Sequence, residues 1–382
     1  MSNLNRRAFM IGSSVLAGSL PYASAVGGTP SASGSAPPAY GPAPGIAKLN
    51  ANENPYGPSP AALRAMADAA RNGAYYVNES VPRLKAMIAE QHGLTPDHIL
   101  LSAGSSGALT YLAVAASKKG KIVGPDLFWD TTTRMALRQS GGEMLRLPKT
   151  TDLQIDLEAM AAAIDDDVAM VHVTNPNNPT GLVLPPDELA AFCRKASKKV
   201  TVLLDEAYNE LTDDPAANTM IPLIKEGHDV LVARTFSKIY GLAGMRVGYL
   251  IGLPERVAEA GVYSLGDYAL NQAGVAAAVA SYSDEKFLAY SKANIVAARE
   301  MLSAALRENG LSALPSSTNF MFVDLGARNA EEFRQAMAER GVLIRGIYRD
   351  YTQWSRVSMG LMEDVERYVA ALPPVLDQIA VA

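Results

Sequence analysis

Cysteine is almost absent from this sequence, and so is any strong excess of one charge. Cys193 is the single cysteine among 382 residues, which excludes an internal disulfide and a cysteine-based metal site. We expect it to be a small buried residue on a helix. The chain carries 34 Lys and Arg against 39 Asp and Glu, a net charge of −5. This balance predicts no general attraction to nucleic acid or to an anionic membrane, and we expect no metal site.

The first 45 residues differ from the rest of the chain. Arg6 and Arg7 precede a mildly apolar segment that ends near Leu20 and is too short to span a bilayer as an ordinary helix. Ala23-Ser24-Ala25 then offers a small-residue cleavage site. The order of these features resembles a twin-arginine export signal, with a disordered basic tail as the alternative. We therefore expect an exported, periplasmic protein without a stable membrane anchor after cleavage, and a flexible leader over residues 27–45.

The rest of the chain is long enough for one large and one smaller domain. Strand and helix patterns alternate from about residue 84 to 280, which predicts an α/β domain with a mostly parallel sheet covered by helices. Residues 284–309 form one long amphipathic helical pattern, and the short elements after it are typical of an α+β unit. We expect an N-terminal arm and part of the small domain in residues 46–80, the large domain in 81–280 and the small domain in 281–382.

The most informative stretch follows the apolar run Val230–Ala233. That run predicts a buried strand, and Lys238 comes shortly after it. A lysine held there is partly desolvated, which favours the neutral amine that can attack a carbonyl. Thr235, Ser237 and Arg246 supply hydrogen-bond donors for a phosphate, which an arginine can bind with two bonds. Taken alone, the same pattern also fits an exposed lysine in a glycine-rich turn.

Polar residues also follow other predicted strands. Residues 102–107, Ser-Ala-Gly-Ser-Ser-Gly, lie between a strand and a helix, an arrangement that points backbone N–H groups at an anion. Asp205 ends an apolar strand, at the place where open α/β sheets bind ligands. The asparagine- and proline-rich turn 175–181 can donate amides to a ligand. Phe128 and Trp129 either pack in the core or stack on a flat ring.

Three motifs together resemble one family. Residues 175–181 (NPNNPTG), 205–208 (DEAY) and 237–249 (SK, then GLAGMRVGY) occur in the order found in the class I and II aminotransferases, fold-type I enzymes that use pyridoxal 5′-phosphate. The branch they resemble is that of the histidinol-phosphate aminotransferases, over Leu49 to about Ile379. The resemblance implies the type I fold, an α/β large domain around a mostly parallel, seven-stranded sheet plus a smaller α+β domain. It also implies ping-pong transfer of an amino group to a 2-oxo acid through a Lys238 Schiff base.

The resemblance implies a role for each motif residue. The catalytic residues are Lys238, which forms the imine and moves a proton, Asp205, which pairs with the pyridinium nitrogen, and Tyr208, which hydrogen-bonds the phenolic oxygen. The cofactor-binding residues are Gly104, Ser105, Ser106, Gly107, Trp129 (or Phe128), Asn178, Asp205, Tyr208, Thr235, Ser237, Lys238 and Arg246. Tyr76 resembles a residue that reaches the phosphate from a second subunit, which implies a homodimer with shared active sites. The substrate-binding residues are Arg356, Arg345, Tyr56 and Asn319, with a plain surface arginine as the alternative for Arg345.

Other reactions and substrates stay open at this point. A decarboxylase, a β-lyase or a cyclase could use the same frame, because the fold does not determine which bond to Cα breaks. A cofactor-binding protein without catalysis is a third alternative. The expected partners are small molecules, an amino donor (an amino acid or a histidinol-phosphate-like amine) and a 2-oxo acid. Because export fits poorly with cytoplasmic histidine synthesis, we expect an amino-acid aminotransferase outside that pathway.

Overall fold

The computed structural model describes residues 41–379. The predicted export signal and most of the leader lie outside these residues. Within residues 41–379, no helix combines the length and the apolar character needed to cross a membrane. One compact unit begins at Pro44 and contains the described residues that follow.

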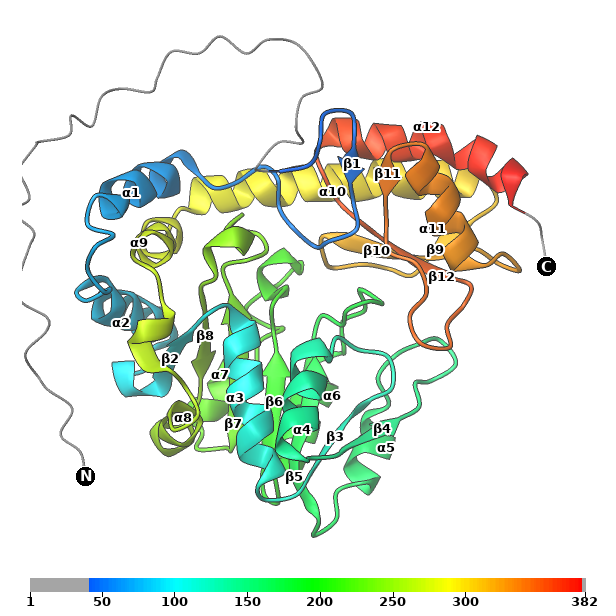
Figure 1. The fold of residues 1–382 in the computed structure, drawn as a ribbon. Helices are drawn as coiled ribbons and strands as arrows, with labels where there is room; N and C mark the ends of the chain where they lie inside the picture. Colours follow the sequence, from blue (N-terminus) through cyan, green and yellow to red (C-terminus); the bar gives the residue numbers. More distant parts are fainter. Residues whose placement is uncertain (1–40, 380–382) are drawn as a thin grey trace, which may run out of the picture. The chain divides into compact units, whose positions relative to one another are not determined.

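A seven-stranded sheet forms the centre of this unit, in the order β2-β8-β7-β6-β5-β3-β4 (Figure 1). The strands are β2 (Ile99–Ser102), β3 (Lys121–Pro125), β4 (Met144–Leu147), β5 (Val168–Thr174), β6 (Thr201–Asp205), β7 (Val230–Thr235) and β8 (Gly248–Ile251). The pairs from β4 to β7 are parallel, and β8 is antiparallel to both of its neighbours. The predicted mostly parallel sheet is confirmed.

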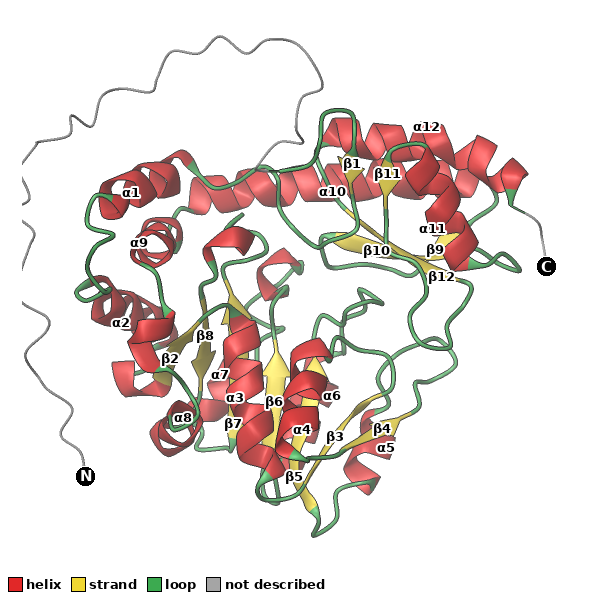
Figure 2. Ribbon diagram, viewed as in Figure 1, coloured by secondary structure: helices red, strands yellow, loops and turns green. Residues whose placement is uncertain are grey.

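The helices of the described chain are divided between this central sheet and the smaller sheets of the chain (Figure 2). They are α1 (Pro60–Ala70), α2 (Ser80–His92), α3 (Ser105–Ser117), α4 (Thr131–Ser140), α5 (Leu157–Ala162), α6 (Pro186–Ala196), α7 (Ile221–Lys225), α8 (Pro254–Gly261), α9 (Gln272–Ser281), α10 (Glu285–Glu308), α11 (Ala330–Glu339) and α12 (Met362–Gln378). Short 3-10 helices are η1 (Pro96–His98), η2 (Asn209–Leu211), η3 (Ala243–Met245) and η4 (Gly266–Ala269).

Both faces of the sheet are apolar. Successive side chains of a strand point to opposite faces. Leu203 of β6 and Leu231 of β7 pack with α3, α4 and α8, whereas Val202 and Leu204 belong to the core on the other face. A strand buried on both faces needs apolar residues at every position, which is why these strands appear in the sequence as continuous apolar runs. Cys193 is buried on α6, as expected.

Two smaller sheets lie outside the central one. The antiparallel sheet β12-β10-β9 contains Trp354–Ser358, Phe320–Asp324 and Ser312–Ala313, and β1 (Ala47–Lys48) pairs in parallel with β11 (Val342–Leu343). The helix α10 confirms the long amphipathic helix predicted over residues 284–309. The domain boundaries near residues 80 and 280 stay a prediction.

The segment after β1 runs along the edge of β12. Leu49 N donates to Leu343 O (2.8 Å), and Leu49 O accepts from Ser358 N (2.9 Å). These bonds hold the polar segment 50–54 next to β12, and its Asn52 also contacts Tyr208 and Lys238, which follow β6 and β7 of the central sheet. The pairing of β1 therefore positions part of the site described next.

Candidate active site

A cavity of about 650 Å³ lies at the carboxyl ends of β5, β6 and β7. Thr174, Asp205 and Thr235 are the last residues of these strands, and all three line the cavity. Parallel strands bring their carboxyl ends to one edge of a sheet, so residues far apart in sequence meet there. The predicted residues that line the cavity are Ser105, Ser106, Phe128, Trp129, Asn178, Asp205, Tyr208, Thr235, Ser237, Lys238, Arg246, Arg345 and Arg356.

Lys238 and Asp205 form the polar centre of the cavity. The Lys238 Nζ donates to the backbone oxygen of Asn52 (3.0 Å) and lies 5.4 Å from the ring centroid of Tyr208. Burial, followed by the positive charge of Arg356, lowers the pKa of Lys238 to about 8. Burial raises the pKa of Asp205 to about 6, although the N–H of Ala207 opposes that shift. The lysine is thus closer to its neutral form than an exposed lysine, and the aspartate lacks a full counter-charge.

A group of donors surrounds the first turn of α3. Ser105 and Ser106 begin this helix, and the first N–H groups of a helix have no partner inside it. Arg246 Nη1 donates to Ser237 Oγ (3.3 Å), and Thr235 Oγ1 donates to the same oxygen (2.9 Å). Hydroxyls, a guanidinium and a helix amino end at one place are suited to a phosphate group.

Gly104 and Gly107 frame this turn without lining the cavity. Gly104 has a φ of +70°, and a Cβ added there would lie 2.4 Å from Arg246 Nη2. A Cβ at Gly107 would lie 3.1 Å from the Ser102 Cβ. Glycine at position 104 therefore permits both the left-handed backbone and the close approach of the guanidinium.

Arg356 on β12 presents a buried guanidinium to the cavity. Its Nη1 donates to Asn178 Oδ1 (2.9 Å) and its Nη2 donates to Asn50 O (3.1 Å). The guanidinium carbon lies 5.4 Å from the ring centroid of Phe320 and 5.6 Å from that of Tyr348. Its buried Nε has no hydrogen-bond partner among residues 41–379. A fixed guanidinium with an unused N–H is suited to the carboxylate of a ligand.

Arg345 lies beside Arg356 in the cavity wall. The two residues exchange backbone hydrogen bonds of 3.0 Å and 3.2 Å, and the guanidinium carbon of Arg345 lies 5.5 Å from the ring centroid of Tyr348. One tyrosine ring thus contacts both guanidinium groups. This location favours a substrate-side role for Arg345 over the alternative of an unrelated surface arginine.

Both candidate aromatic residues line the cavity. The ring of Phe128 meets the His172 ring edge-on at 5.1 Å, and Phe128 is only 6% exposed. Trp129 is less buried and packs against the cluster formed under α3 and α4. Phe128 is held by the strand beside it, which leaves Trp129 as the more accessible aromatic surface.

Besides Gly104 and Gly107, three predicted site residues are not among those that line the cavity. Tyr56 Oη accepts from the N–H of Met362, so this tyrosine joins the segment before α1 to α12. Asn319 is fully buried, and its Nδ2 donates to Glu53 O (2.9 Å). Tyr76 is 74% exposed and packs edge-on against Tyr268 at 5.2 Å. The structure gives Tyr56 and Asn319 bridging contacts inside the chain rather than a position in the cavity wall.

Other residues of the cavity wall carried no assigned role in the sequence. They include Asn50, Asn52, Arg134, Tyr348 and Arg349. Segment 50–54 contains three asparagines, and a polar loop of this kind can line a pocket; this is the only signal in the sequence for the first two residues. Tyr348 and Arg349 belong to the connection between β11 and β12, where no motif marks them.

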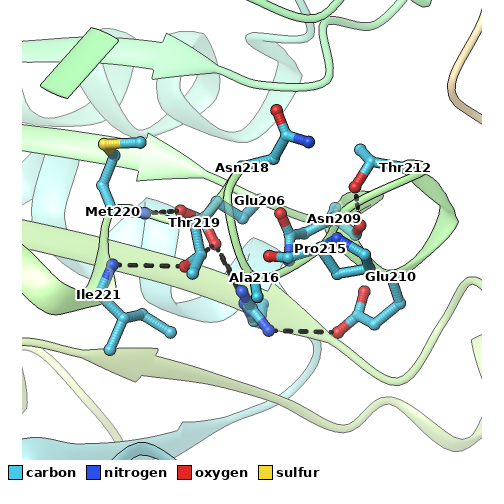
Figure 3. A network of polar contacts seen from close by, with 12 residues as sticks. Glu206, Asn209, Glu210, Thr212, Pro215, Ala216, Asn218, Thr219, Met220 and Ile221 are labelled. Atoms are coloured by element: carbon cyan, nitrogen blue, oxygen red, sulfur yellow. Dashed lines mark hydrogen bonds and ion pairs between the residues drawn. The ribbon is translucent and has the colours of Figure 1, made fainter. Parts of the chain in front are cut away.

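A buried ionic network lies directly behind the site. Glu206, next to Asp205, is fully buried and accepts hydrogen bonds from Thr219 Oγ1 (2.8 Å), Met220 N (2.8 Å) and Arg234 Nη2 (2.7 Å). Figure 3 shows Glu206 within this network. Because Arg234 precedes Thr235, the network joins the ends of β6 and β7, the two strands that carry the polar centre.

Comparison with known proteins agrees with this arrangement. Residues 44–372 match the family described as aminotransferase class I and II. The chain is 38% identical over 343 residues to histidinol-phosphate aminotransferase 2 of Ralstonia nicotianae, covering 88% of this chain and 90% of that protein. It is 37% identical over 325 residues to an aromatic amino acid aminotransferase of Thermobifida fusca, covering 85% of this chain and 88% of that protein.

A solved structure shows the same likeness in three dimensions. The structure of histidinol-phosphate aminotransferase from Sinorhizobium meliloti in complex with pyridoxal-5′-phosphate matches with a TM-score of 0.80 at 30% identity, over 86% of this chain and 90% of that one. This confirms the predicted type I fold and the predicted enzyme class. The chain belongs to the class I and II aminotransferase family.

Proposed function

We propose that this aminotransferase uses pyridoxal 5′-phosphate to pass an amino group from an amino acid to a 2-oxo acid. The observation that carries the proposal is that the amine of Lys238 and the buried carboxylate of Asp205 line one cavity. The cofactor, when bound, supplies an electron-accepting ring and a carbonyl carbon for the amine. The cavity fits this cofactor, because the hydrogen-bond donors around the start of α3 suit its phosphate group. The absence of a side chain at Gly104 leaves room for the Arg246 guanidinium beside these donors.

Under this proposal each cavity residue has a separate role toward the cofactor. The partly neutral amine of Lys238 would hold the cofactor covalently and, once released, would move a proton at the substrate Cα. Asp205 gains a counter-charge when it faces a protonated ring nitrogen, which favours its ionised form. Asn178 and Tyr208 would hydrogen-bond the phenolic oxygen, and Trp129 would cover the ring.

Arg356 is proposed to select the amino donor. Its unused, buried Nε supports binding of an α-carboxylate, and Arg345 beside it adds positive charge. An amino acid fits this wall, and the Thermobifida fusca relative acts on aromatic amino acids by name. Histidinol phosphate, named for other relatives, is the second candidate, because a phosphate can occupy the same arginines.

A half-reaction screen tests the proposal. Cofactor-loaded protein is mixed with single amino donors, including histidinol phosphate, without an acceptor. We expect an amino acid to convert the bound cofactor to pyridoxamine phosphate, seen by absorption and mass spectrometry. Release of carbon dioxide or elimination products without pyridoxamine phosphate would favour a decarboxylase or a lyase instead. A preference for histidinol phosphate over every amino acid would overturn the choice of donor.

We also propose that two copies of the chain share their active sites. Tyr75, Tyr76, Leu265 and Tyr268 expose between 73% and 76% of their surface, and Tyr76 packs against Tyr268. Exposed apolar groups of this size support a protein interface. Under this proposal Tyr76 reaches the cofactor phosphate of the second subunit.

We further propose that the N-terminal segment directs export of the folded protein to the periplasm. The support is the order of Arg6-Arg7, the apolar segment and Ala23-Ser24-Ala25 in the sequence. Replacing Arg6 and Arg7 together with lysine should leave the full-length chain in the cytoplasm, as measured by cell fractionation and N-terminal sequencing. Equal export of the double variant would contradict the proposal.

A further inference from the structure

We propose that Asn52 is a positioning residue that directs the Tyr208 hydroxyl proton toward the cofactor. The inference rests on the proposed function, because it concerns the phenolic oxygen of the proposed cofactor. It assigns a task to a residue of the N-terminal segment that no sequence motif marked. Two side-chain amides, those of Asn52 and Asn178, face the Tyr208 hydroxyl.

Asn52 connects the residues that follow the central sheet to β12 of the small sheet. It is 6% exposed, and its Nδ2 donates to Tyr208 Oη (2.9 Å) while its Oδ1 accepts from Ser358 Oγ (2.6 Å). Its backbone oxygen accepts from Lys238 Nζ (3.0 Å). The same residue thus contacts the lysine that attaches the cofactor and the tyrosine beside it, and Ser358 on β12 holds its side chain from the other direction.

A second amide also donates to Tyr208. A guanidinium can only donate, so the bond from Arg356 Nη1 fixes the carbonyl oxygen of Asn178 on the arginine side (2.9 Å). The Nδ2 of Asn178 then faces Tyr208 Oη at 3.5 Å. The tyrosine oxygen therefore accepts from the amide of Asn52 and also faces the amide of Asn178.

The orientation of Asn52 consequently decides where the Tyr208 proton goes. Because its oxygen accepts from Asn52, the O–H of Tyr208 is left to donate elsewhere, and the tyrosine lines the cavity. Burial raises the pKa of Tyr208 to about 12, so the hydroxyl keeps its proton at neutral pH. If residue 52 accepted instead, Tyr208 would donate to it and the cofactor would lose that bond. The amide at position 52 thus makes Tyr208 an obligate donor toward a phenolic oxygen.

The test exchanges the donor for an acceptor. Asn52→Asp keeps the shape of the side chain, but its carboxylate can only accept when ionised. Asn54→Asp is the matched control, because Asn54 lies in the same segment, is 4% exposed and donates to Ile239 O and Ser291 Oγ rather than to Tyr208. Tyr208→Phe, alone and combined with Asn52→Asp, completes the set. Circular dichroism and thermal melting report whether each variant is folded.

The readout is the pH midpoint of the visible absorption of the bound cofactor, measured without substrate. A hydrogen bond to the phenolic oxygen stabilises its negative charge, so its loss should raise the midpoint. We expect Tyr208→Phe and Asn52→Asp to raise it by similar amounts, and the double variant to shift it no further. Asn54→Asp should leave it unchanged. If Asn52→Asp does not fold, Ser358→Ala replaces it, since it frees the amide to turn, and it should shift the midpoint in the same direction.

Two results would overturn the inference. A midpoint that Asn52→Asp or its replacement leaves unchanged would show that the amide does not control Tyr208. Shifts that add in the double variant would show that the new charge acts on the cofactor directly. Failure of the proposed function is seen separately in the unaltered protein, where borohydride would attach no cofactor to Lys238, and the role of Asn52 would fail with it.

Discussion

At the scale of single residues, the Lys238 amine is the group whose environment has the clearest chemical effect. Its pKa falls to about 8, first through burial and then through the positive charge of Arg356. Both causes disfavour the ammonium form. The site thus keeps a useful fraction of neutral amine near neutral pH without any neighbouring base.

Cofactor capture by the apoprotein should therefore depend on pH. Only the neutral amine attacks a carbonyl, so the capture rate should rise with pH and level off above about pH 8. Arg356→Gln removes the second cause of the lowered pKa and should move the curve to higher pH, whereas Arg356→Lys keeps the charge and should move it less. Stopped-flow absorption measures the rate. Identical curves for all three proteins would contradict this account.

Arg356 should also control recognition of the donor carboxylate. A hydrogen bond to a charged group contributes about 1.5–3 kcal/mol, which corresponds to roughly 10- to 100-fold in kcat/KM. Arg356→Gln should lose about that much with an amino acid. It should lose little with the matching amine that lacks the carboxylate, which serves as the control substrate. Equal losses with both substrates would indicate a structural role for Arg356 instead.

At the scale of elements, a buried ion pair between Glu206 and Arg234 joins the carboxyl ends of β6 and β7. Glu206 and Arg234 join β6 to β7, and the same carboxylate accepts from Thr219 and Met220 just before α7. Two strand ends and one loop thus share a single buried carboxylate. The residues on the opposite side of these strand ends are Asp205 and Thr235, so the network limits how far they can move.

Breaking this network should destabilise the fold. Removing one member of a buried ion pair costs about 3–5 kcal/mol, because the other charge stays buried without its partner. Glu206→Gln should lower the free energy of unfolding by an amount of that order, measured by urea denaturation. Glu226→Gln is the control, since its pair with Arg194 is exposed and the unfolding midpoint should not move. A stable Glu206→Gln protein would show that the pair contributes little.

The elements that the sequence predicted share strong local patterns. The apolar runs of β5, β6 and β7 and the amphipathic pattern of α10 come from burial that is visible in consecutive residues. The strand β8 was missed, because its four residues follow a glycine-rich turn. The helix α4 was missed as well, because its sequence TTTRMALRQS is polar and contains three β-branched residues.

The site could be predicted only in part for a related reason. Asp205 and Lys238 follow recognisable strands, so their neighbourhood could be inferred from topology. The contact between Asn52 and Tyr208 joins residues 156 positions apart. Tyr348, which contacts two arginines, lies in a connection without a motif. Pairings of this kind depend on how the small sheets dock and leave no local signal.

At the scale of the whole molecule, the exposed tyrosines predict an assembly. Tyr268→Asp places a charge in the exposed aromatic pair that we propose as part of the interface, and it should convert a dimer to a monomer in light scattering. Met135→Asp, at an exposed apolar position on α4, is the control and should leave the mass unchanged. A protein that is monomeric before any substitution would refute the shared site.

The position of segment 50–54 has a consequence for synthesis on the ribosome. The backbone oxygen of Asn50 accepts a hydrogen bond from Arg356, which is synthesised 306 residues later. A nascent chain emerges from its amino end first. Segment 50–54 therefore leaves the ribosome long before β12, its partner in the cavity wall. A nascent chain that already contains Lys238 still lacks the groups from β12 that complete the site. Enzyme activity should thus begin only after β12 has left the ribosome, and a translation product that stops before β12 should lack the complete site.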